Sequence, residues 1–188
     1  MIAGEQREGG KMEEYVTLEE VLFFREKKAG MQEELRKKYE KVTIVALGMN
    51  VPGPRKTSPR LLSAFTAGVE ELDRLLFKNR LSVLEEATVK EKAGYLKLYA
   101  VKSLDHLAVK KITVQIEETH PLGRLLDIDV YDGEGRGISR EELGAPVRKC
   151  LICEKDAKLC GRSRSHGVEE LCRSMENIMD SWLKEGGR

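Results

Sequence analysis

The fold is decided by the stretch Val42-Thr-Ile-Val-Ala-Leu-Gly-Met-Asn-Val-Pro-Gly-Pro-Arg-Lys-Thr-Ser-Pro59. It opens with an unbroken run of β-branched and apolar residues, which is typical of a strand buried on both faces. The glycines and prolines that follow exclude a helix or a sheet interior and predict a loop. Ser58 and Pro59 form an N-cap and a first helical residue, and they predict a helix that continues to about Asn79.

Two more long helices are predicted outside this stretch. Thr17-Leu-Glu-Glu20 is a capping box and predicts a helix to about Tyr39. We expect its first half to pack on the core, and its second half to be solvated or broken at Gly30. A C-terminal helix is predicted from apolar residues at helical spacing, namely Leu171, Met175, Ile178, Met179 and Trp182.

Strands are predicted where the sequence is apolar or alternates between apolar and polar residues. A short helix capped by Ser103 should end near Val109. The predicted strands cover residues 81–89, 95–101, 113–117 and 126–131, and a turn at 132–135 should close a hairpin onto 137–139. We therefore expect an α+β fold, in which a mixed sheet is flanked by helices.

Length and charge exclude several classes of protein. The chain has 188 residues, which suits a single catalytic domain over 17–188 after a flexible leader over 1–16. It has 33 Lys and Arg and 32 Asp and Glu. This balance argues against a protein that binds nucleic acid or an anionic membrane mainly through its net charge. No apolar run approaches a membrane span, and the polar N-terminus is unlike a signal peptide, which predicts a cytoplasmic location.

Asp127 and Asp129 alternate with apolar residues in the strand predicted at 126–131. Because side chains repeat every two residues along a strand, both carboxylates should project from the same face. Like charges so close together repel each other unless a cation neutralises them. A carboxylate pair with substrate phosphates is the usual setting for Mg²⁺ in phosphoryl and nucleotidyl transfer. The alternative is an edge strand with one solvated face.

The loop His120-Pro-Leu-Gly-Arg124 brings a cation and a glycine backbone beside this pair. Gly123 would let backbone amides approach a phosphate, and the Arg124 guanidinium can bind one through two nitrogens. Glu117, on the strand predicted before the loop, is a candidate third carboxylate. His120 is either part of the site or a turn residue with a local hydrogen bond.

A second basic candidate site ends the loop between the first predicted strand and its helix. Arg55 and Lys56 follow a stretch stiffened by proline and glycine and precede a helix N-terminus, an arrangement that suits an anionic ligand. The alternative is an ordinary connection with solvated basic residues.

The C-terminal segment 146–188 contains Cys150, Cys153, Cys160 and His166 within a short span. Three thiols and one imidazole, starting with C-x-x-C, are the ligand set of a Cys₃His zinc site. The later spacings match no common zinc finger, so a buried packing cluster is the alternative. Disulfides are not expected in a reducing compartment. Cys172 is interpreted as a small core residue of the last helix.

Several of these motifs, in this order, closely resemble one known family. They are NVPGPRK from Asn50, Phe65-Thr-Ala-Gly68, HPLGRLLDIDV from His120, ISR from Ile138, and PVRKCLICEKDAKLC from Pro146 with His166. They are similar to the apo-citrate lyase phosphoribosyl-dephospho-CoA transferases, the holo-acyl-carrier-protein synthases of citrate lyase. The resemblance runs from about Thr17 to the final helix.

The resemblance implies an activity, partners and a fold. Members of the family transfer 2′-(5″-phosphoribosyl)-3′-dephospho-CoA from its triphosphoribosyl precursor to a serine of the citrate lyase acyl carrier protein, and pyrophosphate leaves. This chemistry implies a nucleotidyltransferase-like fold, although Gly123-Arg124 stands where that fold usually has Gly-Ser. Mg²⁺ on Asp127 and Asp129 fits such a reaction. Gly123, Arg124, Arg55 and Lys56 are the candidate phosphate ligands.

Proton transfer from the acceptor serine requires a general base, for which Glu117 and His120 are the candidates. Two other functions stay open at the level of sequence. One is a non-catalytic, zinc-stabilised module that binds an acyl carrier protein. The other is a nucleotidyltransferase with a different substrate.

Overall fold

The core of the protein is a four-stranded sheet with the order β2-β3-β1-β4. The computed structural model describes residues 15–187, so most of the predicted leader lies outside the described residues. The strands are β1 (Thr43–Met49), β2 (Val83–Glu91), β3 (Gly94–Val101) and β4 (Leu126–Tyr131). All neighbouring strands are antiparallel, so the expected α+β class is confirmed but the sheet is not mixed. β4 is an edge strand that pairs only with β1 within the sheet.

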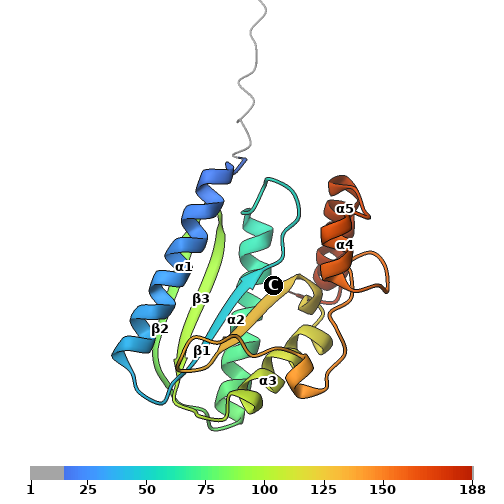
Figure 1. Cartoon of the computed structure of the whole chain (residues 1–188). Helices are drawn as coiled ribbons and strands as arrows, with labels where there is room; N and C mark the ends of the chain where they lie inside the picture. The colour runs from blue at the N-terminus through green and yellow to red at the C-terminus, as the bar shows by residue number, and fades with distance from the viewer. Residues whose placement is uncertain (1–14, 188) are drawn as a thin grey trace, which may run out of the picture.

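Helices cover both faces of this sheet (Figure 1). The helix α1 (Leu18–Lys38) lies on one face, where its apolar side chains meet those of β1 and β3. The helices α2 (Pro59–Lys78) and α3 (His106–Thr119) cover the other face. The buried strand, the Pro/Gly loop and the Ser58-capped helix are therefore as the sequence predicts.

A third apolar cluster joins the C-terminal segment to the rest of the fold. The short helix α4 (Ala157–Ser163) was not predicted, whereas α5 (Val168–Lys184) was. Met175, Met179 and Trp182 of α5 pack on the first half of α2 and on the short 3₁₀ turn η1 (Gly123–Leu125). None of the helices in the part of the chain that the structure describes is long and apolar enough to span a membrane.

The capping box at Thr17 is confirmed, but the expected division of α1 is wrong. The helix continues through Gly30 without a break, and its buried residue, Leu35, lies in the second half. Phe24 and Met31 share the sheet-facing side with Leu35, because their spacings of seven and four residues return to one face. Leu18, at the start of the helix, is 75% exposed.

The predicted strand at 113–117 is also wrong, because these residues belong to α3. Asp105, not Ser103, caps this helix by accepting a hydrogen bond from the backbone amide of Ala108. Five alternating residues fit a helix as well as a strand when both sides of the helix are buried. In α3 the apolar side faces the sheet, while Lys110 and Glu117 are buried against β4.

The turn after β4 is confirmed as a very short hairpin. The backbone amide of Gly135 donates to the carbonyl of Asp132, and Tyr131 pairs with Gly137 in a single bridge. A 3₁₀ turn, η2 (Glu141–Leu143), then leads toward the cysteine-containing segment.

Candidate active site

Asp127 and Asp129 project from the same face of β4, as their spacing predicts. They stand opposite Gly48 and Ala46 of β1, on the face of the sheet that α1 covers. The apolar residues that alternate with them, Leu126, Ile128 and Val130, point to the opposite face, which packs on α2 and α3. The side chains of Asp127 and Asp129 are 54% and 42% exposed, so an ion or a substrate can reach both carboxylates. The strand is also an edge strand, as the alternative interpretation required.

A cleft of about 240 Å³ runs along the outer edge of β4. Asp127 and Asp129 line it together with Glu117 and Ser139. Basic side chains also contribute to the lining, and they are Lys110, Arg140, Arg148 and Lys158. The cleft therefore combines carboxylates that can hold a cation with cations that can hold phosphate.

Glu117 reaches this cleft from a helix, not from the strand expected for it. Its side chain is 5% exposed, and its Oε1 accepts a 3.0 Å hydrogen bond from the backbone amide of Ile128. Arg140 donates to its Oε2 at 2.5 Å, and Arg148 donates to its Oε1 at 3.2 Å. Three donors therefore already engage this carboxylate.

Lys110 lies on the buried side of α3 and makes a second contact between that helix and the edge strand. Its Nζ donates to the backbone carbonyl of Ile128 at 3.2 Å. Burial lowers the pKa of Lys110, and the nearby negative charge of Glu117 offsets part of this effect. The amide and the carbonyl of Ile128, which an edge strand usually leaves open, are therefore both occupied by side chains from α3.

Cations approach the aspartate pair from two sides. Lys28 Nζ of α1 lies 2.8 Å from Asp129 Oδ2, and Arg148 Nη1 lies 3.4 Å from Asp127 Oδ1. The pKa of Asp127 is nevertheless raised, because the cleft walls displace water from its carboxylate and because Asp129 is a like charge nearby. Burial alone would lower the pKa of Lys28, but Asp129 outweighs burial and raises it. A cation bound between the two carboxylates would offset the repulsion from Asp129 that helps to raise the pKa of Asp127.

The loop from His120 to Arg124 serves the packing of α3 rather than the cleft lining. His120 Nδ1 accepts from the backbone amide of Leu122 at 3.1 Å, which matches the local turn interpretation. Burial lowers the pKa of His120, and the negative charge of Glu71 on the neighbouring helix α2 offsets part of this effect. A Cβ on Gly123 would lie 2.5 Å from the carbonyl oxygen of Glu117, so this position has room only for glycine. Arg124 Nη2 donates to the backbone carbonyls of Lys149, at 3.2 Å, and of Cys150.

The structure does not bring the second basic candidate site to the carboxylates. Lys56 Nζ donates to the backbone carbonyl of Val51 at 2.6 Å. Burial lowers the pKa of Lys56, Cys172 of α5 raises it, and Arg25 of α1 lowers it further. Lys56 and the adjacent Arg55 lie outside the residues that line the cleft.

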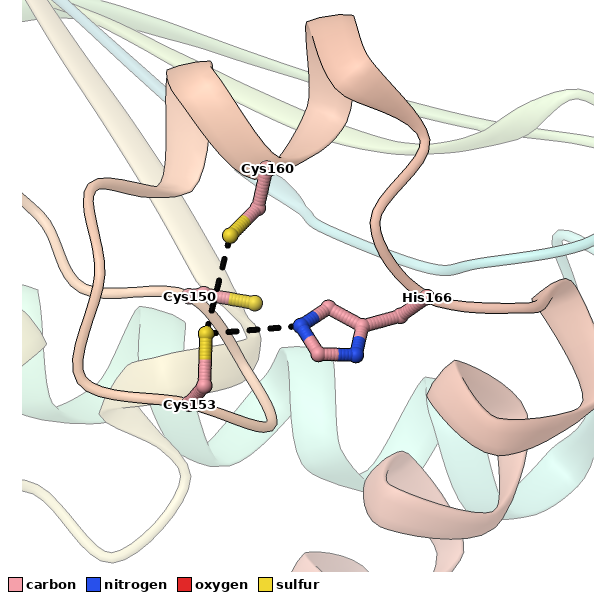
Figure 2. A group of neighbouring side chains, drawn as sticks. All are labelled: Cys150, Cys153, Cys160 and His166. Carbon is pink, nitrogen blue, oxygen red and sulfur yellow. Dashed lines mark hydrogen bonds between the residues drawn. The ribbon is translucent and has the colours of Figure 1, made fainter.

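The four predicted zinc ligands converge from three segments of the chain (Figure 2). Cys150 and Cys153 come from the loop before α4, Cys160 comes from α4, and His166 comes from the loop after it. Their ligand atoms all lie within 4.8 Å of one another. Cys153 Sγ lies 3.6 Å from Cys160 Sγ and 3.3 Å from His166 Nε2. The four side chains thus form a cluster that could bind a metal ion.

The charge state and the surroundings of this cluster suit a ligand set. A hydrogen bond from the backbone amide of Lys155, together with His166, lowers the pKa of Cys153 to about 7. Burial raises the pKa of Cys160. His166 Nδ1 lies 3.5 Å from Glu170 Oε2, which is the way a carboxylate orients a ligating histidine. Cys172 lies apart, with its Sγ directed at the carbonyl of Pro52.

Residues 16–182 match the family model described as apo-citrate lyase phosphoribosyl-dephospho-CoA transferase. The chain belongs to this family. A relative in Streptococcus pyogenes serotype M18, named "Probable apo-citrate lyase phosphoribosyl-dephospho-CoA transferase", is 35% identical over 92% of this chain and 90% of its own length. A relative with the same name in Vibrio cholerae is 33% identical over 87% and 91%. "Protein CitXG" of Leuconostoc mesenteroides is 38% identical over 94% of this chain and 37% of its own length.

In this family member, five cations near the carboxylates were not predicted as site residues. They are Lys28, Lys110, Arg140, Arg148 and Lys158. A signal for two of them was present, because Arg140 ends the ISR motif and Arg148 lies in PVRKC, both of which carry the family resemblance. Lys28 and Lys110 lie on helices among other charged residues, and nothing in the local pattern separates them from solvated ones.

Proposed function

We propose that this chain transfers 2′-(5″-phosphoribosyl)-3′-dephospho-CoA from its triphosphoribosyl precursor to a serine of the citrate lyase acyl carrier protein. The serine oxygen would bond to the phosphorus next to the ribose, the bond to the outer two phosphates would break, and pyrophosphate would leave with the serine proton released. Family membership supports this transfer. The observation that carries it is the accessible pair Asp127 and Asp129 in a cleft lined with basic side chains.

The donor set of this pair fits Mg²⁺, because both carboxylates are accessible oxygen ligands and Asp127 retains a raised pKa that an added cation would relieve. Bound there, Mg²⁺ would supply positive charge that offsets the charge of the leaving pyrophosphate. Arg148 and Lys158, which share the cleft, would bind phosphate oxygens. We assign Glu117 to positioning Arg148 and Ile128, since its oxygens already accept three hydrogen bonds.

The cysteine and histidine cluster fits a structural Zn²⁺. Three sulfurs and one imidazole nitrogen form a closed four-ligand set, and their separations suit ligands at about 2.0–2.3 Å from one shared ion. Purified protein should then contain about one equivalent of zinc by elemental analysis, and strong chelation should lower its melting temperature. Metal-free protein of unchanged stability would return the cluster to a packing role.

The transfer is tested by the mass of the carrier. Apo-carrier protein incubated with the enzyme, the triphosphoribosyl precursor and Mg²⁺ should gain the mass of the prosthetic group on its serine. A carrier that binds but gains no mass would favour the non-catalytic module. Mass gained from a different nucleotide donor, and not from the precursor, would favour another nucleotidyltransferase. Asp127→Asn serves as the matched inactive variant.

A further inference from the structure

Residues 148–157, which include the first two candidate zinc ligands, form a loop whose two ends are hydrogen-bonded to each other, and Arg148 is its first residue. The backbone carbonyl of Arg148 accepts from the amide of Ala157 at 2.8 Å, and the amide of Cys150 donates to the carbonyl of Lys155 at 2.7 Å. Lys149 and Asp156 pair in an isolated bridge. The position of the Arg148 backbone therefore depends on the loop that Cys150, Cys153 and Cys160 close.

The side chain of Arg148 leaves this loop and enters the carboxylate cleft. Its Nη1 lies 3.2 Å from Glu117 Oε1 and 3.4 Å from Asp127 Oδ1. Its Nη2 donates to the backbone carbonyls of Leu126, at 2.6 Å, and Arg124, at 3.0 Å. One guanidinium thus joins the start of β4, the buried carboxylate of α3 and one member of the aspartate pair.

Few other contacts hold this loop in place. Its helix α4 has only seven residues, and a helix of that length is not stable without outside support. Leu151 is partly buried against α5, its carbonyl accepts a hydrogen bond from Ser174 of that helix, and Arg124 holds the carbonyls of Lys149 and Cys150. A four-ligand metal site would be the strongest cross-link available to the loop, because it would tie residues 150, 153, 160 and 166 to a single point.

We propose that metal binding by the Cys₃His cluster holds Arg148 in the cleft, and that Arg148 binds the phosphate groups of the donor there. The inference deepens the proposed function and rests on it for the identity of the donor. The cluster then acts on the reaction only through Arg148. Without the ion, the loop loosens, the guanidinium leaves Asp127 and Glu117, and the cleft binds a polyphosphate less tightly.

Inorganic pyrophosphate, titrated by calorimetry in excess Mg²⁺, tests this coupling without any need for catalysis. The full chain is loaded with Zn²⁺, stripped with a chelator and desalted, or reloaded. Stripping should weaken pyrophosphate binding roughly ten- to hundredfold, which is the range for loss of a charge-assisted contact, and reloading should restore it. Arg148→Ala should weaken binding by a similar factor, and stripping that variant should then add little.

Two further variants separate positioning from general loss of charge or fold. Lys149→Ala removes a neighbouring cation whose side chain pairs with Glu154, and it should bind pyrophosphate as the wild type does. His166→Cys keeps four ligands and should retain binding, whereas His166→Ala should lose metal and binding together. Hydrogen exchange should rise on stripping in a peptide that covers residues 146–158.

Two outcomes would overturn the inference. One is pyrophosphate affinity that does not change on stripping, and the other is an Arg148→Ala variant that still loses affinity when the metal is removed. A different result would reject only the proposed function. If the carrier gains no mass but zinc still strengthens pyrophosphate binding, the coupling between the cluster and Arg148 holds.

Discussion

The Glu117 carboxylate of α3 accepts a 3.0 Å hydrogen bond from the backbone amide of Ile128, the residue between the two aspartates of β4. The same carboxylate pairs with Arg140 and Arg148. A single buried side chain therefore fixes the edge strand and two of the cleft's guanidinium groups. This makes Glu117 the residue on which the local geometry of the carboxylate pair most depends.

Glu117→Ala should lower the free energy of unfolding by about 3–5 kcal/mol, because it removes the buried carboxylate that the Ile128 amide, Arg140 and Arg148 share. Glu117→Gln keeps an acceptor for Ile128 and should lose less. Urea denaturation measures both. Glu118→Ala is the matched control, since Glu118 is exposed and pairs with the same Arg140. Its expected cost is within about 1 kcal/mol, and equal losses for Glu117→Ala and Glu118→Ala would contradict the role of Glu117.

Asp127→Asn and Asp129→Asn should each abolish transfer while the protein stays folded, but their melting temperatures should move in opposite directions. Asp127→Asn removes a like-charge repulsion and should leave the melting temperature unchanged or raised. Asp129→Asn leaves Lys28 of α1 without its counter-ion and should lower the melting temperature. Calorimetry and the carrier assay test the two effects separately. Near-wild-type transfer by either variant in saturating Mg²⁺ would remove the metal assignment.

Gly123→Ala should destabilise the protein by about 1–3 kcal/mol, because the new Cβ would overlap the backbone carbonyl of Glu117 at the end of α3. Gly30→Ala is the control, since no atom lies within 4 Å of its new Cβ in the middle of α1. That change should stabilise the helix by about 0.5–1 kcal/mol. The two melting temperatures should therefore shift in opposite directions, and a fall in both would show that α1 does not tolerate the methyl group.

Lys110→Met should change how stability depends on alkaline pH. The pKa of Lys110 is lowered from 10.5 in the folded protein by burial, against the opposing charge of Glu117. Between that lowered pKa and 10.5 the unfolded chain binds the extra proton, so the wild type gains stability as pH rises through this window. The variant lacks this gain. As pH rises toward 10.5, the melting temperature of the wild type should therefore increase relative to that of the variant. Curves that stay parallel would contradict the lowered pKa of Lys110.

Arg124→Ala should lower catalytic efficiency roughly ten- to hundredfold, because Arg124 holds the Lys149 and Cys150 carbonyls next to Arg148, and loss of a charge-assisted contact costs about 1.5–3 kcal/mol. Arg124→Lys should retain part of the efficiency. Arg74→Ala is the control, since Arg74 is exposed and pairs only locally with Glu71. It should change stability within about 0.5 kcal/mol and leave pyrophosphate release unchanged. Identical kinetics for Arg124→Ala and Arg74→Ala would show that Arg124 does not contribute to the transfer.

The parts of the fold that the sequence predicted are those with strong local signals. The caps at Thr17 and Ser58, the buried run that became β1 and the alternation of β4 each specify one element by itself. The failure at residues 113–117 has a tertiary cause. Glu117 and Lys110 are buried polar residues whose partners lie in β4, so the helix does not show the usual single apolar stripe.

The candidate site was predicted in the same uneven way. The aspartate pair and the four metal-ligand candidates could be found, because each depends on spacing along a single segment of chain. Arg148 could not be placed, since its role depends on where a loop after η2 returns to β4. His120 and Gly123 were given site roles because they neighbour the aspartates in sequence, whereas the structure uses both for the end of α3.

The contact between Lys28 and Asp129 joins residues 101 positions apart in the chain. Synthesis therefore produces α1, β1, β2 and β3 well before the strand that carries the aspartates. Until β4 arrives, β1 has an open edge and is apolar on both sides, which is the kind of strand that pairs with other chains. Placement of the aspartate pair and protection of the open β1 edge are thus the same folding event.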